Sequence, residues 1–319
     1  MFDQLTLEQR YVISALLKRN VSKKEIAEEI VVSVSTVYRE IRRNRNSRGG
    51  YSPKLAHEMA MERRERIVRN SALKPDVLKN ALKLLVEEQW SPRQISGHMR
   101  LRGEHISHER IYQEIRADKT GVLASNTRHG MKHRKRTVVV GGVKNIPNRK
   151  SIHERPSEAD GKRFGDWEMD LIIDPKQKAI LTLVERSVNF IIIKKLPEGK
   201  KAKPLAETAV RLLAPWRRGV LTITTDNGGE FAEHEMITKG LHRKSMPDVP
   251  VFFADPYSSW QKGAVENANG LIRQYIPKGA DFDLFTDEDI DEIQRKLNLR
   301  PREKLGFLTP IAMFNKYFS

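Results

Sequence analysis

Five short apolar runs follow one another between residues 167 and 255, and their order constrains the fold more than any other feature of the chain. The runs are WEMDLIID, AILTLVER, FIIIKKL, VLTITTD and VPVFFAD. Short polar turns separate the first three, whereas the helix-like segment PLAETAVRLLAPWRR precedes the fourth. Three strands followed by helix, strand, helix and strand predict an α/β layer built on five strands.

This order of elements resembles the ribonuclease H-like fold, which implies a mixed five-stranded sheet. In that fold Asp170, on the first strand, and Asp226, at the end of the fourth, would lie on neighbouring strands. Their shared edge of the sheet is where open α/β sheets bind ligands. Strand alternation puts Asp166, Glu168 and Asp174 on the same face as Asp170, so spacing alone leaves the choice among these four acids open.

A third acid, Glu266, lies in the helix-like run QKGAVENANGLIRQY. Together with Lys262, Asn269 and Arg273 it forms one polar stripe, with positions i, i+4, i+7 and i+11 on a single helix face. The stripe therefore offers a metal ligand flanked by cations. The alternative is that Asp170, Asp226 and Glu266 are merely exposed acids.

Three carboxylates in one pocket would repel one another at neutral pH unless a cation lay between them. The chain has no cysteine, and its histidines show no ligand spacing, which favours Mg²⁺ or Mn²⁺ over zinc. Two such ions, roughly 3.5 to 4 Å apart, could activate a water or a 3′-hydroxyl and stabilise the leaving oxygen of a phosphodiester. We therefore expect two ions in the active site.

Positive charge is concentrated in the first half of the chain. Residues 1 to 150 hold 32 Lys and Arg against 16 Asp and Glu, whereas residues 151 to 319 hold 26 against 25. This imbalance favours a polyanionic partner, most often nucleic acid. No apolar run approaches the roughly 18 residues that a membrane helix needs, and the N-terminus lacks the plan of a signal peptide. We expect no membrane contact and a cytoplasmic, nucleoid-associated location.

The basic half contains a first helix-turn-helix candidate. Thr6 with Gln9 and Ser22 with Glu25 have capping-box spacing ahead of two helices, and Ser33 can cap a third. In the helix-turn-helix plan that third helix enters the major groove. Its polar face would then read bases near its start and contact phosphates at its arginine-rich end, through Ser35, Thr36, Arg39, Arg42 and Arg43. The alternative is a three-helix bundle with a solvated basic face.

The third helix recurs. SVSTVYREIR, from Ser33, aligns without gaps with SHERIYQEIR, from Ser107, and Ser91 with Pro92 marks the start of the helix before it. The second recognition surface would comprise His108, Glu109, Arg110 and Gln113. Because Glu109 and Glu114 lower its charge, a packing or dimerisation bundle is a stronger alternative here.

The expected chain is an α+β multidomain protein with two all-α helix-turn-helix domains before a catalytic domain. A basic helix, SPKLAHEMAMERRERIVRN, joins the two units, and KHRKR in the later linker could lie along DNA through Arg134 and Arg136. Trp167 and Trp260 are expected to anchor the core or a loop rather than stack on bases. The expected divisions are 1–48 and 71–119 for the helix-turn-helix domains, 49–70 for the connecting helix, 120–160 for the linker and 161–319 for the catalytic domain.

Four segments carry a family resemblance: GDWEMDLI, TTDNGGEFAEH, DPYSSWQKGAVENANGLIRQYIPKG and LNLRPREKLGF. They closely resemble the insertion-sequence-thirty family of bacterial DDE transposases. The tandem helix-turn-helix units and the IHERP segment before GDWE fit the same family, so the resemblance covers nearly the whole chain. Three departures stand out: Ser259 and Val34 replace prolines usual in the family, and the 39 residues between Asp226 and Glu266 are more than usual. The surplus is assigned to residues 239–248, as a basic DNA-contacting insertion or a longer loop.

The resemblance implies that Asp170, Asp226 and Glu266 form the DDE triad, with Asp166 as the next candidate for the first position. It implies binding to the terminal inverted repeats of a mobile element, cleavage of its ends, transfer of the 3′-hydroxyls to target DNA, and at least a dimer at the paired ends. By the same similarity Lys262, Asn269 and Arg273 would hold DNA near the metals.

Two other functions remain possible at this stage. One is a sequence-specific DNA-binding repressor whose ribonuclease H-like half is catalytically inert or only dimerises. The other is a nuclease of the same fold that cuts DNA without joining it. An intact acidic triad argues against the repressor, and strand-transfer products would exclude the plain nuclease.

Overall fold

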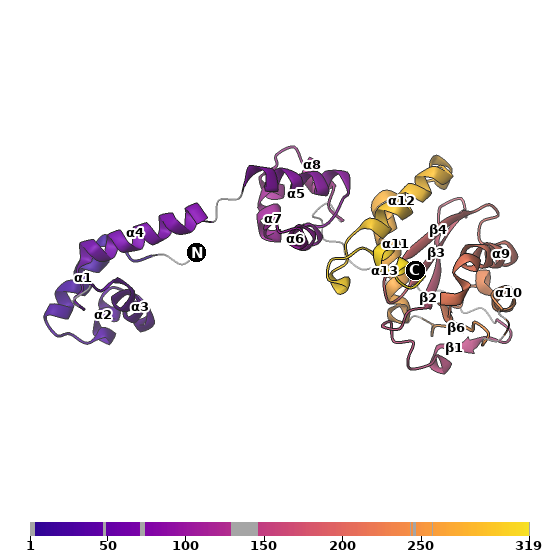
Figure 1. The fold of residues 1–319 in the computed structure, drawn as a ribbon, viewed down its shortest axis with the longest axis horizontal. Coiled ribbons are helices and arrows are strands. Elements are labelled where there is room, and N and C mark those ends of the chain that lie inside the picture. Colours follow the sequence, from indigo (N-terminus) through magenta and orange to yellow (C-terminus); the bar gives the residue numbers. More distant parts are fainter. Residues whose placement is uncertain are drawn as a thin grey trace. The chain divides into compact units, whose positions relative to one another are not determined.

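The structure is a computed structural model that describes residues 4–46, 49–70, 74–128, 146–242, 244, 247–256 and 258–318. The chain forms two compact units, Met1–Lys74 and Pro75–Ser319. The first unit is helical, and the second combines a helical part with a sheet covered by helices (Figure 1). The predicted α+β class is therefore confirmed.

The first unit contains four helices, and the predicted caps begin three of them. Thr6 and Gln9 form a capping box before α1 (Leu7–Lys18), and Ser22 and Glu25 form one before α2 (Lys23–Glu29). Ser33 caps α3 (Val34–Asn44), and α4 (Pro53–Asn70) follows. Capping satisfies backbone N–H groups that a helix start leaves without partners, which explains why these serines and threonines mark the boundaries.

A small apolar core holds this unit together. The buried side chains come from α1, α2, α3 and the segment before α1: Leu5, Ile13, Ile26, Ala27, Ile30 and Val37. The helix α4 packs against α1 and α3. Beneath it lies a buried ion pair, in which Arg10 Nε lies 2.7 Å from Glu40 Oε1, and Arg10 Nη1 also lies 3.2 Å from His57 Nδ1 on α4. The helix predicted as a connector therefore packs onto α1 and α3.

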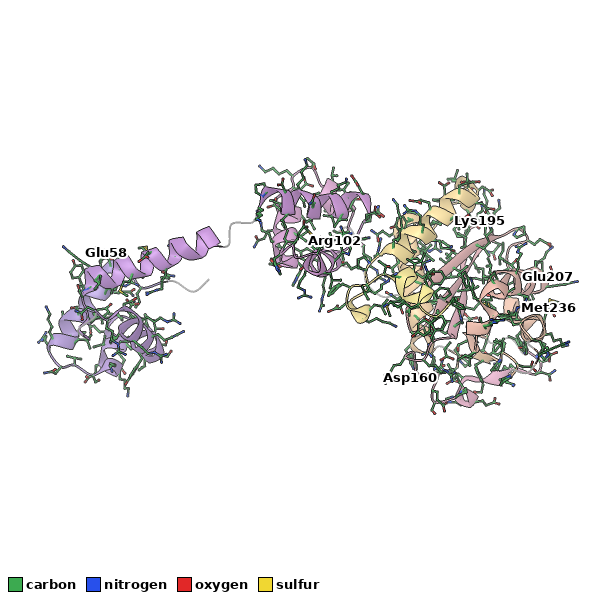
Figure 2. All side chains as sticks on the ribbon, viewed as in Figure 1. Glu58, Arg102, Asp160, Lys195, Glu207 and Met236 are labelled. Carbon is green, nitrogen blue, oxygen red and sulfur yellow. The ribbon has the colours of Figure 1, made fainter. Side chains whose placement is uncertain are left out.

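The helical part of the second unit begins with α5 (Pro75–Glu87) and α6 (Pro92–Leu101), followed by α7 (His108–Ala117) and the short α8 (Val122–Ser125). Ser91 forms a capping box with Gln94, Pro92 occupies the first turn of α6, and Ser107 caps α7. Arg102, labelled in Figure 2, ends α6 and opens the turn before α7. The sequence repeat thus corresponds to two structural units with the same capped helix pair.

The sheet has six strands, not the five expected. They are β1 (Lys150–Ser151), β2 (Asp166–Ile173), β3 (Ala179–Glu185), β4 (Ile191–Leu196), β5 (Thr222–Thr225) and β6 (Val251–Phe253), in the order β1-β6-β5-β2-β3-β4. The strands β3 and β4 are antiparallel to their neighbours, whereas β5, β6 and β1 run parallel to β2 and to one another, so the sheet is mixed as expected. The additional strand escaped prediction because two polar residues paired with β6 carry no apolar periodicity.

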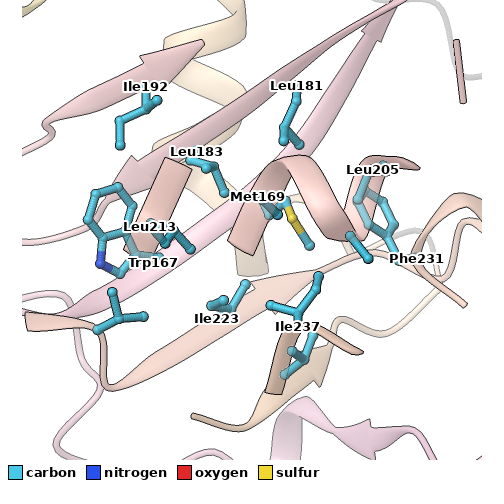
Figure 3. Packing of buried hydrophobic residues seen from close by; sticks show 14 of the residues in the cluster. Trp167, Met169, Leu181, Leu183, Ile192, Leu205, Leu213, Ile223, Phe231 and Ile237 are labelled. Atoms are coloured by element: carbon cyan, nitrogen blue, oxygen red, sulfur yellow. The ribbon is translucent and has the colours of Figure 1, made fainter. Parts of the chain in front are cut away.

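Helices cover both faces of the sheet. One face packs against α9 (Ala202–Leu213), α10 (His234–Gly240) and the aromatic end of α13 (Pro310–Asn315), around buried side chains such as Trp167, Met169 and Leu213 (Figure 3). The other face packs against α11 (Gly263–Tyr275) and α12 (Asp287–Leu299). Short 3-10 turns lie at Ile152–Glu154, Ala214–Gly219, Gly229–Phe231, Ser259–Lys262, Phe282–Leu284 and Glu303–Leu305.

None of the helices in the described ranges is both long enough and apolar enough to span a lipid bilayer.

Candidate active site

The two aspartates expected on neighbouring strands lie side by side. The strands β2 and β5 pair in parallel, with Glu168 opposite Thr224. Two residues further along, the same register leads to Asp170 on β2 and Asp226 directly after β5. The Asp226 carboxylate also accepts a hydrogen bond from the Gly228 amide, at 2.9 Å, which fixes the turn after the strand. The carboxyl end of β5 therefore meets the middle of β2 at a pair of carboxylates.

Asp170 differs from the neighbouring acids Asp166, Glu168 and Asp174 in its hydrogen-bond partners. The Asp166 carboxylate is fully buried and accepts bonds from Arg163 Nη2 at 2.8 Å and from the Thr222 hydroxyl at 2.7 Å. Glu168 accepts from Arg186 Nε and from the Val265 amide, both at 2.8 Å. The carboxylates of Asp166 and Glu168 are therefore engaged in hydrogen bonds that link elements of the fold.

Asp174 is held in the same way, because its carboxylate accepts from the amides of Lys178 at 2.8 Å and Phe282 at 3.1 Å. Of the four acids that strand alternation left open, Asp170 is the one that faces a second carboxylate. Asp170 and Asp226 thus share one cationic neighbour, Lys262.

An ammonium group lies between the two aspartates. Lys262 Nζ is 3.4 Å from Asp170 Oδ1 and 3.2 Å from Asp226 Oδ2, and the lysine is 5% exposed. Burial alone would lower the pKa of Lys262, but the two carboxylates outweigh it and raise that pKa. A cation is therefore the favoured neighbour of this carboxylate pair.

Burial raises the pKa of the Asp170 carboxyl to about 6; the Lys262 ammonium acts in the opposite direction, and the nearby charge of Asp226 adds to the rise. The carboxylate is also oriented by Asn269, whose Nδ2 donates to Asp170 Oδ2 at 2.8 Å. The amide oxygen of Asn269 is buried and has no hydrogen-bond partner among the described residues. Such an orphaned oxygen beside two carboxylates fits a site that receives a hydrated divalent cation.

Glu266 lies on the same helical stripe as Lys262 and Asn269, but its side chain is exposed. Within the described ranges no three acidic, histidine or cysteine side chains are close enough to share a metal ion. The structure therefore brings together Asp170, Asp226, Lys262 and Asn269, and it leaves the third predicted ligand outside the cluster. The cation at the centre is the ammonium of Lys262 itself.

Arg273, at the end of the stripe, is engaged in the fold. Its guanidinium donates to the carbonyls of Ile173 and Pro277, each at 3.3 Å, and burial lowers its pKa. It ties the end of β2 to α11. Sequence spacing placed Arg273 correctly on the face with Glu266 but could not reveal these two bonds.

The predicted reading face of the first helix-turn-helix is open to solvent. Ser35, Arg39, Arg42 and Arg43 on α3 are exposed, and Thr36 is partly buried. The Thr36 hydroxyl lies 2.8 Å from the Ser33 hydroxyl, at the start of the helix. The arginines cluster at the C-terminal end of α3, as the sequence predicted for phosphate contact.

The second reading face is largely neutralised by its own acids. On α7, Arg110 pairs with Glu114 and donates to Gln113, while Arg116 pairs with Glu109. His108 is exposed. These pairs leave α7 with less free positive charge than α3, in line with the alternative raised for this unit. Arg134 and Arg136 lie outside the described residues.

Two features near the carboxylates were not anticipated. Trp260, expected as an anchor, is 74% exposed, so this prediction was wrong, whereas Trp167 is fully buried as expected. Trp260 lies in the 3-10 turn Ser259–Lys262. In addition, Asp255 is bonded by His153 Nε2 at 2.9 Å and by Gln261 Nε2 at 2.8 Å. His153 belongs to the IHERP segment, which was noted without a role.

Several known proteins are similar in sequence to this chain over nearly its full length. A family model described as a helix-turn-helix domain matches residues 2–44. The transposase for insertion sequence element IS4351 of Bacteroides fragilis is 46% identical over 99% of this chain and 97% of its own length. The transposase for IS1086 of Cupriavidus metallidurans is 33% identical over 98% and 94%, and transposase InsI for IS30A of Escherichia coli is 34% identical over 96% and 82%.

Proposed function

Because the chain belongs to the insertion-sequence-thirty family of transposases, we propose that it binds the terminal inverted repeats of an insertion sequence, cleaves the ends and transfers the 3′-hydroxyls to target DNA. The catalytic unit is proposed to be ribonuclease H-like, with Asp170, Asp226 and Glu266 as a DDE triad. The single observation that carries this proposal is the Asp170–Asp226 pair with a cation between its carboxylates.

Divalent metal ions, Mg²⁺ or Mn²⁺, would be held by Asp170 and Asp226 and completed by Glu266. When bound, two such ions activate the attacking oxygen and stabilise the leaving oxygen in an in-line displacement at phosphorus. The donor set fits, since it consists of carboxylate oxygens with the amide oxygen of Asn269 beside them.

The side chains of this site have separate tasks. Asn269 orients the Asp170 carboxylate through its 2.8 Å hydrogen bond. Lys262 partly neutralises the carboxylate pair, and its ammonium would contact a DNA phosphate in the loaded site. Glu266 projects from the same helix face, one turn after Lys262, and would complete the set of carboxylates that holds the ions.

The DNA is recognised first by the helical units. The exposed arginines of α3 supply phosphate contacts, and the start of that helix supplies base contacts in the major groove. The helix α7 makes a smaller contribution, because its arginines are paired with glutamates. We propose that at least two copies of the chain act at the paired ends.

The test is a cleavage and strand-transfer assay on DNA that carries the terminal repeats, with Mg²⁺ or Mn²⁺ and with a chelator. Asp170→Asn, Asp226→Asn and Glu266→Gln are expected to abolish both products while DNA binding persists. Glu207→Gln, which changes an exposed carboxylate on α9, is the matched control and should retain activity.

Each rival function has its own signature in this assay. Cleavage without joined products would identify a nuclease, and metal-independent binding without any cleavage would identify a repressor with an inert catalytic unit. The exposed position of Glu266 makes its variant the most informative of the three. Full activity of Glu266→Gln would overturn the assignment of the third ligand.

A further inference from the structure

A second polar pocket lies away from the two aspartates, where the helical part of the second unit meets the sheet domain. Its volume is about 290 Å³. Its walls come from the start of α6, from α11 and from the segment after α12, and they include Arg93, Arg128, Asn267, Arg302, Glu303 and Lys304. Four of the lining side chains are cationic and one, Glu303, is acidic.

Arg302 is the unusual member of the pocket. It is 7% exposed, and its Nη2 donates to the Leu297 carbonyl at 3.1 Å. Its Nε is buried and meets no hydrogen-bond acceptor among the described residues. A buried guanidinium N–H without an acceptor is costly, so such a group is a strong indication that an acceptor arrives from outside.

The surrounding charges give the same indication. Burial, together with repulsion from the neighbouring Arg300 and Arg128, lowers the pKa of Arg302 to about 9. Arg300 lies deeper, is 2% exposed, and is held by Gln274 at 3.2 Å and by the Tyr275 hydroxyl at 2.7 Å. The two buried guanidinium groups of Arg300 and Arg302 thus lie near the exposed guanidinium of Arg128.

The acids on the pocket walls do not compensate this charge. Glu303 is exposed and already pairs with Arg93, at 2.6 Å. Lys304 Nζ is bonded to the Arg186 carbonyl at 2.7 Å and to Asn189 at 2.9 Å, neither of which carries a negative charge at the bonding atom. The pocket therefore has a net positive charge that an anion would relieve.

The anion is identified by the geometry and the partners available to it. A guanidinium N–H with a second guanidinium nearby suits the tetrahedral oxygens of a phosphate. The first turn of the ten-residue helix α6 also lines the pocket and contributes the positive end of its dipole. On the opposite wall, Asn267 directly follows Glu266 in α11.

We propose that this pocket binds a phosphodiester group of the DNA strand that enters the active site, through Arg302 and Arg128. It would fix the DNA between the second helix-turn-helix unit and the helix that carries Glu266. The inference rests on the proposed function in so far as the substrate is DNA. It does not require cleavage.

The experiment measures binding of the full chain to a double-stranded oligonucleotide in the presence of a chelator, as a function of salt concentration. Each phosphate contact contributes roughly 0.9 to the slope of log K against log salt. Arg302→Gln and Arg128→Gln are each expected to lower the magnitude of that slope by about 0.9. Between 50 and 200 mM salt, the affinity of each variant for DNA should therefore fall by about 3.5-fold less than the affinity of the wild type. Arg295→Gln, which changes an exposed arginine of α12 paired with Glu292, is the matched control and should leave the slope unchanged.

Arg302→Gln could disturb folding, so a second variant leaves the buried arginines in place. Asn267 is exposed on the pocket wall, and Asn267→Asp introduces a negative charge there. The loss of DNA affinity that Asn267→Asp causes is expected to be at least tenfold larger at low salt than at high salt. An unchanged slope in Arg128→Gln together with unchanged affinity in Asn267→Asp would overturn the proposal.

Inorganic phosphate distinguishes the source of the anion. If the pocket takes a free anion, phosphate should raise the thermal unfolding temperature of the wild type but not of Asn267→Asp, and DNA binding should be insensitive to the pocket variants, which contradicts the proposal. A failure of the proposed function gives another result. In that case Asp170→Asn and Asp226→Asn would leave DNA cleavage unchanged, while the pocket variants would still reduce the salt dependence of DNA binding.

Discussion

Lys262 Nζ lies 3.2 Å from Asp226 Oδ2, so a protein cation occupies the place beside the aspartates where the proposed metal ions would bind. The same ammonium also approaches Asp170. This single ammonium compensates one of the two negative charges that the carboxylates carry when both are ionised. This arrangement leads to predictions about stability as well as activity.

Replacement of Asp170 by Asn should stabilise the metal-free protein above about pH 6. The carboxyl has a folded pKa of about 6, raised by burial from 3.8. As the pH rises from about 4 to 6, the unfolded chain loses this proton before the folded chain does, so ionisation of Asp170 lowers the stability of the wild type over that window.

The rise corresponds to at most about 3 kcal/mol, and because 20% of the side chain is exposed we expect a gain of about 1–2 kcal/mol at pH 7.5. Urea unfolding of Asp170→Asn and wild type with a chelator measures the difference. It should vanish at pH 4. A variant less stable than the wild type at pH 7.5 would contradict this account.

Divalent cations should stabilise the wild type above pH 6. Binding to the folded state alone contributes about 2.7 kcal/mol when the free ion is a hundredfold above its dissociation constant. Thermal unfolding with Mg²⁺ or Mn²⁺ measures this increase. It should be absent in Asp226→Asn and retained in Glu207→Gln, and an equal increase in both variants would place the ion elsewhere.

Glu168→Ala should destabilise the protein strongly, unlike substitution at Asp170. Its carboxylate, 1% exposed, is bonded to Arg186 and to the amide that opens α11. Removal of one partner from a buried ion pair leaves the other charge uncompensated, which costs about 3–5 kcal/mol. Denaturant unfolding measures the loss, and the double variant with Arg186→Met should recover part of it.

The sequence predicts that Glu168 and Asp170 share a strand face, but it does not predict which of the two carboxylates is bonded within the fold. The strand boundaries followed from apolar runs, and the helix starts followed from Ser and Thr caps whose backbone bonds are local. Spacing put the four acids on one face of the predicted strand, and in the structure Asp166, Glu168 and Asp170 lie on β2 while Asp174 follows its end. The difference between the acids depends on bonds from Arg163, Arg186 and α11, and such bonds leave no periodic signal in the sequence.

The exposed position of Glu266 and the cationic pocket at Arg302 also could not be predicted from local sequence patterns. Helical spacing placed Glu266 on the face with Asn269, but it could not show that the side chain is exposed. Arg302 lies in a segment, LNLRPREKLGF, that contributed only to the family resemblance. Its burial arises from packing between two parts of the chain that no local pattern links.

Gly97→Ala should weaken the packing of α6 against the sheet domain. A Cβ at this position would lie 2.2 Å from the ring of Phe307. The substitution favours the isolated helix by about 1 kcal/mol, but overpacking of this kind costs about 1–3 kcal/mol. Limited proteolysis of the full chain should become faster, and Phe307→Ala in the same chain should remove the added effect of Gly97→Ala. Independent, additive effects of the two substitutions would contradict the contact.

Arg43→Gln and Ser35→Ala should separate affinity from specificity at α3. Loss of the arginine is expected to reduce binding to all DNA sequences and to lower the salt slope by about 0.9. Loss of the Ser35 hydroxyl should instead narrow the difference between terminal-repeat DNA and random DNA by about 1–3 kcal/mol, provided that it contacts a base. Fluorescence anisotropy with both DNAs measures the two effects. Identical behaviour of the two variants would contradict the assignment of base reading to the start of α3.

Trp260→Ala should weaken binding of DNA at the active site without a loss of stability. The indole is 74% exposed in the turn that ends at Lys262, so its removal creates no cavity. A base that stacks on this exposed ring would contribute about 1–3 kcal/mol. Leu284→Ala, which removes another apolar side chain that is 77% exposed, is the matched control. Quenching of 2-aminopurine fluorescence at the cleaved end should occur with the wild type and with Leu284→Ala, and should be lost with Trp260→Ala. Equal quenching by all three proteins would mean that Trp260 does not contact the DNA.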